Sequence, residues 1–421
     1  MRKKDRDGYN MIYFDNSATT AVLPEAAEAA KKYMCDMYYN PAAAYSPAVA
    51  VERDVNAART RLASCLNADA SELIFTSGGT ESNNMALAGT LAAKHGKCRL
   101  ITSAVEHPSV FEPVTAMKQQ GYDVVVIGVD GTGKLRMDEL AAALDETVGY
   151  VSIMHVNNES GAINDISRIN ALIKKQSPDA VFHVDGVQAF VKMPAVKCDM
   201  YSMSGHKLHA PKGIGALYVR QGVRFMGGQK GGGQENGLRS GTTNVPGIMA
   251  LDAACSNYIA NHEANMDRML KVKRRLYSNL MRIRDVRLNG PDIEEAAPYI
   301  LNMSFLGVRG EVLLHSLMEK GLLVSTGSAC AARHRGKNRV LTAMGITGER
   351  QDGAIRFSVA PLNTEEDAHE AAQYIDESLS LVKHFLSCHF YNPPLVCPAL
   401  PVLLSFYQHA QLSFFRLRSA V

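Results

Sequence analysis

The hydrophobic and polar positions of the first half of the chain follow two alternating periods. Short apolar runs predict buried strands, and between them apolar residues recur every three or four positions, which predicts helices. The predicted strands are 73–76, 100–102, 124–127, 151–154, 181–184, 199–203 and 216–220, and the predicted helices include 24–34, 49–66, 81–91, 137–144 and 167–174. This alternation indicates a largely parallel sheet with helices on both faces. Ligands bind such sheets beyond the carboxyl ends of the strands.

The pattern changes after Pro246. We expect one long charged helix over about 250–284, strands at 300–305, 322–325 and 355–359, and a last helix opened by Thr364 and Glu365. Together these elements predict an α/β protein with a large domain and a smaller α+β domain. The predicted boundaries are an N-terminal segment 1–21 that packs with the small domain, a large domain 22–258, a small domain 259–387, and an atypical, disordered tail 388–421 interrupted by prolines.

Composition limits the kind of protein. The chain has 421 residues, 46% hydrophobic and 21% charged, with a net charge of +3, which gives no argument for a nucleic-acid partner. Its eight cysteines are scattered without zinc-ligand spacing, which favours a reduced compartment and predicts no metal site. No apolar run suits a secretory signal or a membrane span. We therefore expect a cytoplasmic protein without a membrane partner.

Lys207 follows a buried strand in the stretch Ser204-Gly205-His206-Lys207, and a glycine-rich turn leads on to the next strand. An unpaired buried charge is costly, so a lysine here needs a reason. A Schiff base with an aldehyde is one, because a desolvated lysine loses its proton easily. Pyridoxal phosphate is the common aldehyde cofactor. For Lys207 alone, a surface lysine in a loop is the more ordinary interpretation.

Other strand ends carry polar groups that suit the same cofactor. The segment 76–84 joins a strand to a helix start, where glycines and free amides favour phosphate, although a simple helix cap is the alternative. His107 suits stacking on a flat ring, and 157–159 offers amide donors. Asp185 ends a buried strand and needs a cation, which a protonated pyridine nitrogen or a structural arginine could supply. Gln188 could reach the neighbouring ring oxygen.

Two loops complete the candidate chemistry. The glycine-rich segment 231–242 could supply a hydroxyl and amides to phosphate, or serve as a linker between lobes. Cys330 lies in a loop of small residues followed by the basic residues Arg333, His334, Arg335, Lys337 and Arg339. A positive field favours thiolate over thiol, so Cys330 is the candidate nucleophile.

Taken together, these motifs resemble the cysteine desulfurases, the NifS- and IscS-type pyridoxal phosphate enzymes of aminotransferase class V. The resemblance covers about residues 11–386. It rests on the segments 15–20, 76–84, 106–107, 157–159, 183–188, 204–207, 239–242, 328–330 and 356–358.

The resemblance implies a fold-type-I homodimer that takes sulfur from L-cysteine and leaves L-alanine. By motif, Lys207 forms the Schiff base and shuttles protons, His107 stacks on the ring, and Cys330 attacks the substrate sulfur to give an enzyme persulfide. The other implied positions are the cofactor-binding residues Gly79, Thr80, Asp185, Gln188, Ser204, His206 and, from the partner subunit, Thr242, and the substrate-binding residues Asn157 and Arg356. The sulfur acceptor would be a protein such as an iron–sulfur scaffold or a tRNA-thiolation protein.

Two alternatives stay open. Selenocysteine lyase or another class V activity would use the same cofactor site, although an aminotransferase needs no thiol. An inactive cofactor-binding paralogue with a structural role is the second, and the intact set of Lys207, Asp185, His107, Cys330 and Arg356 argues against it. A further hypothesis is that the basic residues after Cys330 favour an acidic docking surface on the acceptor.

Overall fold

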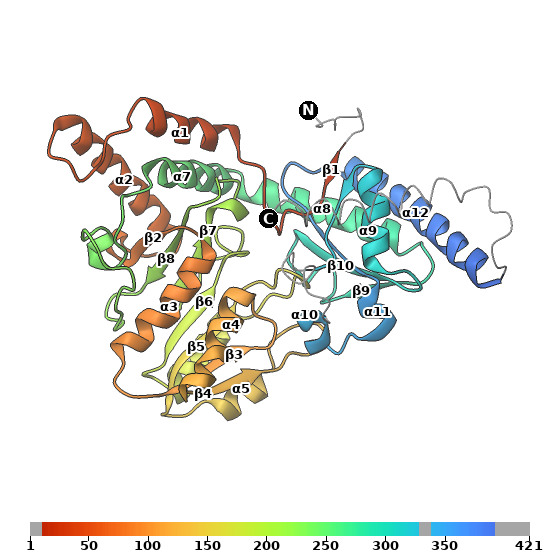
Figure 1. The fold of residues 1–421 in the computed structure, drawn as a ribbon, viewed down its shortest axis with the longest axis horizontal. Coiled ribbons are helices and arrows are strands. Elements are labelled where there is room, and N and C mark those ends of the chain that lie inside the picture. Colours follow the sequence, from red (N-terminus) through yellow and green to blue (C-terminus); the bar gives the residue numbers. More distant parts are fainter. Residues whose placement is uncertain (1–10, 328–337, 392–421) are drawn as a thin grey trace, which may run out of the picture.

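The computed structural model describes residues 11–327 and 338–391. Figure 1 shows two lobes, with α7 (Val245–Ala260) and α8 (His262–Leu280) running from the larger lobe into the smaller. The large lobe contains a seven-stranded sheet in the order β2-β8-β7-β6-β5-β3-β4. Its strands are β2 (Leu73–Thr76), β3 (Arg99–Ser103), β4 (Asp123–Ile127), β5 (Val148–Met154), β6 (Val181–Asp185), β7 (Met200–Ser204) and β8 (Gly215–Val219).

The predicted mixed, mostly parallel sheet is confirmed. Strand β8 runs antiparallel to both of its neighbours, whereas the pairs from β7 to β4 are all parallel. Because the parallel strands point the same way, the residues that follow them meet at one edge of the sheet. That edge carries the site.

Helices cover both faces of the sheet. One core packs α1 (Pro24–Cys35), α2 (Ser46–Ser64), α5 (Met137–Ala143), α6 (Ile166–Gln176) and α7 against one face. A second core lies under α3 (Gly79–Ala93) and α4 (Pro108–Ala116) on the other. The strands are buried on both faces, which explains their uninterrupted apolar runs. Short 3₁₀ turns lie at Ala70–Glu72, Met117–Gln120, Gly205–Lys207 and Glu235–Gly237.

The small lobe is built on an antiparallel sheet in the order β12-β10-β9. Its strands are β9 (Val286–Asn289), β10 (Ile300–Phe305) and β12 (Ala354–Ser358), and its helices are α8, α9 (Gly310–Glu319), α10 (Arg339–Ala343), α11 (Gly348–Asp352) and α12 (Glu365–Tyr391). The N-terminal strand β1 (Ile12–Tyr13) pairs in parallel with β11 (Leu322–Leu323). Ile12 and Phe14 thereby join the core of this lobe.

Two details differ from the sequence prediction. The single helix over 250–284 is wrong: α7 and α8 separate at Asn261, whose side-chain amide donates to the Asn257 carbonyl at 2.9 Å. An asparagine that bonds nearby backbone competes with helix continuation. At the other end, α12 continues through Tyr391, into the segment predicted as the tail, and the rest of that tail lies outside the described residues. None of the described helices is long and apolar enough to cross a membrane.

Candidate active site

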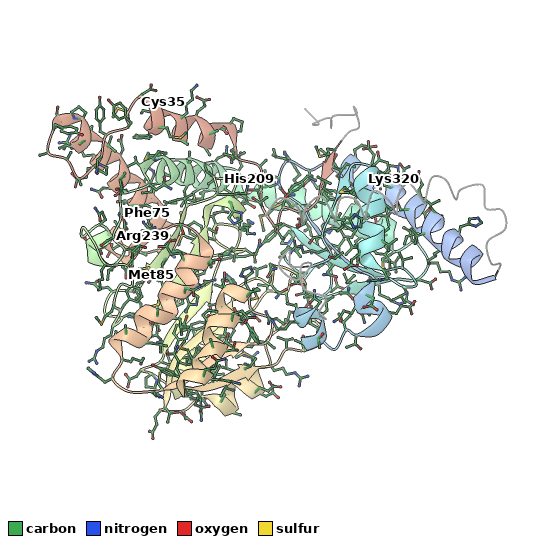
Figure 2. The ribbon with its side chains drawn as sticks, in the orientation of Figure 1. Cys35, Phe75, Met85, His209, Arg239 and Lys320 are labelled. Carbon is green, nitrogen blue, oxygen red and sulfur yellow. The ribbon has the colours of Figure 1, made fainter. Side chains whose placement is uncertain are left out.

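A cavity of about 290 Å³ lies at the carboxyl edge of the parallel strands. Most of the side chains that the sequence predicted for the site line it: Gly79, Thr80, His107, Asp185, Gln188, Ser204, His206, Lys207 and Arg356. A second, smaller cavity adjoins it behind Lys207 and includes His209, which Figure 2 labels where the two lobes meet. The fold therefore gathers residues that are up to 339 positions apart in the sequence, from Ser17 to Arg356.

Lys207 ends the 3₁₀ turn that follows β7. Its Nζ donates to the carbonyl oxygens of Ser17 at 2.5 Å and Ala18 at 2.7 Å. Burial, with repulsion from Arg356 as the next cause, lowers the pKa of Lys207 from 10.5 to about 8. At pH 7 about one tenth of an amine with this pKa is unprotonated, far more than at the usual pKa of 10.5, and the unprotonated amine is the nucleophile.

Asp185 is the last residue of β6, and only 5% of it is exposed. Its two oxygens accept from the Val187 amide at 3.0 Å and from Asn83 Nδ2 at 2.8 Å. No lysine, arginine or histidine among the described residues forms an ion pair with it, so the structural-arginine alternative finds no support there. A buried carboxylate that faces a cavity in this way suits a cationic ring nitrogen.

The start of α3 and the end of β7 form the other end of the cavity. Gly78 caps α3 with φ of 149°, a conformation that favours glycine, and no side-chain cap from the described residues occupies this helix start, where backbone amides favour an anion. The buried Ser204 hydroxyl has no hydrogen-bond partner within 11–327 and 338–391. Burial lowers the pKa of His206 to about 4, so its ring is neutral, with Nδ1 3.2 Å from Thr19 Oγ1. This set of donors fits a phosphate group.

His107 and Gln188 lie on two further sides of the cavity. His107 caps α4, and its Nδ1 accepts from the Ser109 amide at 3.1 Å, which fixes the ring. Burial lowers the pKa of His107, so the ring is neutral and suited to stacking. Gln188 Nε2 donates to the Ser17 carbonyl at 3.1 Å, the same oxygen that Lys207 contacts.

Arg356 lies on β12 and only 2% of it is exposed. One Nη donates to Asp15 Oδ1 at 2.7 Å and the other to the Asn158 carbonyl at 3.0 Å. Its buried Nε has no partner in the described part of the chain. The guanidinium is thus held at the cavity with donor capacity left for a carboxylate.

Asn157 is placed differently from what a substrate contact would suggest. Its side chain is buried beside the cavity, with Nδ2 3.0 Å from the Val105 carbonyl and Oδ1 accepting from the amides of Glu159 and Ser160 at 2.9 and 2.8 Å. It therefore builds the turn that presents the Asn158 carbonyl to Arg356. The direct substrate contact of Asn157 stays a prediction, because its side chain bonds the turn and its neighbour Asn158 lines the cavity.

Thr242 lies in another cavity, of about 180 Å³, beside Phe75 and Arg239, both labelled in Figure 2. Arg239 anchors its segment to the start of α3 through Glu81, with Nε to Oε1 at 2.8 Å. Thr242 does not line the Lys207 cavity of its own chain. This placement leaves its predicted role in the partner's site as a proposal.

Some residues of the site carried no individual prediction. Asn83, Ser17 and Ala18 all line the cavity, and Asp15 holds Arg356. They belong to the polar segments 15–20 and 76–84 that supported the family resemblance. Cys330 and the basic residues at 333–337 lie outside the described residues. Among the described residues, no group of three or more histidine, cysteine, aspartate or glutamate side chains could hold a metal ion.

Comparisons with known proteins agree with this geometry. Residues 12–370 match the aminotransferase class-V family. The chain is 40% identical over 373 residues to a cysteine desulfurase of Trichormus azollae, covering 87% of this chain and 92% of the relative. It is 37% identical to the cysteine desulfurase IscS of Methanosarcina thermophila, covering 89% and 93%.

Solved structures give the same result. A structure titled as a NifS-like protein superposes with a TM-score of 0.83 at 34% identity, covering 88% of this chain and 100% of that one. Another, titled SspA in complex with cysteine, gives a TM-score of 0.73 at 30% identity, covering 83% and 99%. The chain therefore belongs to the aminotransferase class-V family, and the relatives that match most of its length include cysteine desulfurases. The resemblance found in the sequence is confirmed.

Proposed function

We propose that this chain is a pyridoxal phosphate-dependent cysteine desulfurase that takes sulfur from L-cysteine and releases L-alanine. The observation that carries the proposal is the Lys207 amine, whose pKa burial lowers to about 8, in one cavity with Asp185, His107 and Arg356. The residues fit the cofactor, because the unpartnered Ser204 hydroxyl and the start of α3 suit its phosphate and Asp185 suits its ring nitrogen. Bound pyridoxal phosphate would supply an electron sink for the bonds around the substrate α-carbon.

Each side chain has a distinct task in this proposal. Lys207 attaches the cofactor through its amine and moves protons to and from the substrate carbon atoms. His107 stacks on the ring and Gln188 contacts its oxygen. Gly79, Thr80, Ser204 and His206 hold the phosphate, and Thr242 does so from the partner subunit of a homodimer.

Arg356 binds the substrate carboxylate, and the turn built by Asn157 supports it. The Cys330 thiolate attacks the substrate sulfur: a sulfur–sulfur bond forms, the carbon–sulfur bond breaks, and the remaining carbon takes a proton to become alanine. The product on the enzyme is a persulfide, and its outer sulfur passes to an acceptor protein, such as an iron–sulfur scaffold or a tRNA-thiolation protein. We place this activity in the cytoplasm.

The proposal is tested by alanine and sulfide release from L-cysteine in the presence of a reductant. We expect the unchanged protein to form both products, and Lys207→Ala and Cys330→Ala to form neither above background. Full activity of Cys330→Ala would contradict the role of this thiol and would favour a selenocysteine-lyase type of reaction. Retention of the cofactor absorbance band in Cys330→Ala controls for cofactor loss.

A further inference from the structure

The residues on either side of segment 328–337, Gly327 and Asn338, both lie beside the buried carboxylate of Glu159. A Cβ atom added at Gly327 would lie 2.7 Å from Asn338 Nδ2 and 3.1 Å from Glu159 Oε2, so these three residues are in contact. Asn338 Nδ2 donates to Glu159 Oε2 at 2.6 Å, and only 4% of Glu159 is exposed. The two ends of segment 328–337 are therefore held together beside Glu159.

Both ends are also fixed within the small lobe. Asn338 Oδ1 accepts from the Leu341 amide at 3.0 Å, which caps α10, and the Asn338 carbonyl accepts from Gln351 at 3.1 Å. At the other end, the Ser325 hydroxyl donates to the Gly327 carbonyl at 2.6 Å. The Ser325 carbonyl in turn accepts from the Arg356 amide at 2.6 Å. The segment thus starts directly beside the proposed substrate-carboxylate residue.

Arg339 connects the same end to the turn that carries His107. Its guanidinium donates to the carbonyl oxygens of Ala104 and Glu106, and it lies over the Phe111 ring at 3.9 Å. Arg339, one of the basic residues that follow Cys330 in the sequence, is therefore directed into the protein. The Glu106 side chain beneath it is fully buried, and this burial raises its pKa to about 8. Arg339 accordingly joins the end of the segment to the His107 turn through hydrogen bonds to main-chain oxygens, and not through an ion pair with Glu106.

Glu159 is itself held by the site. Its amide donates to Asn157 Oδ1 at 2.9 Å, and its carbonyl accepts from Asn302 at 3.2 Å. The preceding carbonyl, of Asn158, accepts from Arg356. One turn therefore fixes both the proposed substrate clamp and the base of the Cys330 segment.

Chain length limits what this base allows. Cys330 follows Gly327 by three residues, and an extended chain spans at most about 3.6 Å per residue, so their Cα atoms lie within about 11 Å of each other. The position of Gly327 consequently decides which part of the cavity the thiol can reach.

We propose that three positioning residues, Glu159, Asn338 and Arg339, hold the base of the Cys330 segment at the cavity. We call them the loop clamp. Their role is to let the Cys330 thiol meet the substrate sulfur. This inference rests on the proposed desulfurase function. The competing explanation is a purely structural role in capping α10. The two differ in which step they affect, because a loosened clamp slows sulfur transfer to Cys330 while the substrate still reacts with the cofactor.

The test uses the holoenzyme and two readouts after mixing with L-cysteine. The first is the absorbance change of the bound cofactor, and the second is the mass of the Cys330 peptide, which gains one sulfur atom. In Arg339→Met and Glu159→Leu we expect the absorbance change to persist and sulfur to reach Cys330 about ten- to a hundredfold more slowly, the range for a displaced reacting group. Glu159→Gln keeps an oxygen acceptor for Asn338 and should stay within about threefold of the unchanged protein.

Arg350→Met is the matched control. Arg350 also lies in the small lobe and donates to a main-chain carbonyl, that of Leu288 at 2.7 Å, without touching the clamp. Gly327→Ala disturbs the base of the segment by a second route, because it keeps every clamp side chain but strains the backbone at φ of 130° and places a methyl group 2.7 Å from Asn338 Nδ2. It should show the same selective slowing.

Unchanged sulfur arrival in Arg339→Met, Glu159→Leu and Gly327→Ala would overturn the proposal, as would equal loss of both readouts in all three. The same slowing in Arg350→Met would also overturn it. A different result, no sulfur on Cys330 even in the unchanged protein, would refute the desulfurase function itself, so the two failures are distinguishable.

Discussion

The substitution Asp185→Asn should weaken cofactor binding while it leaves the stability of the protein almost unchanged. The substitution keeps the shape of the side chain and removes its charge. An oxygen remains to accept from the Val187 amide, and the new amide group faces Asn83, whose Oδ1 has no partner among the described residues. A rotation of the Asn83 amide would satisfy the new pair, and the Ser109 hydroxyl, which accepts from Asn83 Nδ2 at 2.9 Å, would then have to donate instead. We therefore expect the free energy of unfolding of the cofactor-free protein to change by no more than about 1 kcal/mol, the net contribution of one hydrogen bond.

Cofactor binding should respond strongly to the same change. The charged carboxylate would hydrogen-bond the protonated ring nitrogen, and hydrogen bonds to charged groups contribute about 1.5–3 kcal/mol. The Kd for pyridoxal phosphate should rise by about 10- to 150-fold. Equilibrium dialysis measures this directly, which suits a chain with no tryptophan to report binding by fluorescence.

Asp199→Asn is the matched control, because it should give the opposite pattern. Asp199 is 2% exposed and pairs with Lys174 at 2.5 Å and Arg220 at 2.7 Å. Since both cations are partly exposed and can be rehydrated, its loss should cost about 1–3 kcal/mol of stability and leave cofactor affinity unchanged. A change of less than threefold in the Kd of Asp185→Asn, or an equal change in both variants, would refute the assignment of Asp185.

Three further predictions concern the same cavity. Burial lowers the pKa of Lys207 from 10.5 to about 8, so the amine loses its proton as the pH rises through 8. The rate of cofactor attachment, followed by absorbance, should therefore increase between pH 7 and 9 and then level off. A midpoint near pH 10.5 would contradict this. Gly79→Ala places a Cβ 2.5 Å from Val187 Cγ2 and should weaken cofactor binding by about tenfold. Adding Val187→Ala should restore the cofactor affinity. Equilibrium dialysis that finds no recovery of affinity would exclude this contact as the cause. Arg356→Gln should raise the KM for L-cysteine by more than about tenfold and leave the cofactor Kd within threefold, so an unchanged KM in steady-state assays would argue against the carboxylate role.

The sequence was sufficient for the sheet and for most of the cavity. Strands buried on both faces read as continuous apolar runs, and parallel strands bring their carboxyl ends to one edge, so Asp185, His107 and Lys207 could be placed near one another without coordinates. The break between α7 and α8 was missed because apolar spacing continues across Asn261, and only its local hydrogen bonds end the helix.

The directions in which individual side chains point could not be predicted from the sequence. Asn157 and Asn158 are both amides in one turn, yet the Asn157 side chain holds the turn and the Asn158 main chain holds Arg356. The sequence also grouped Arg339 with the basic residues after Cys330, and it could not show that the guanidinium contacts the carbonyls of Ala104 and Glu106. The contacts of Arg356 and Arg339 join positions 198 to 235 residues apart and depend on how the two lobes pack.

The central claim is that sulfur moves from L-cysteine to Cys330 in a reaction that depends on Lys207. The most direct measurement mixes the holoenzyme with one equivalent of L-cysteine per subunit, without added reductant, and follows both alanine and the mass of the Cys330 peptide. The account predicts one alanine per subunit, formed together with one added sulfur atom on Cys330, and neither product in Lys207→Ala. Alanine formed without sulfur on Cys330, or sulfur on Cys330 in Lys207→Ala, would contradict it.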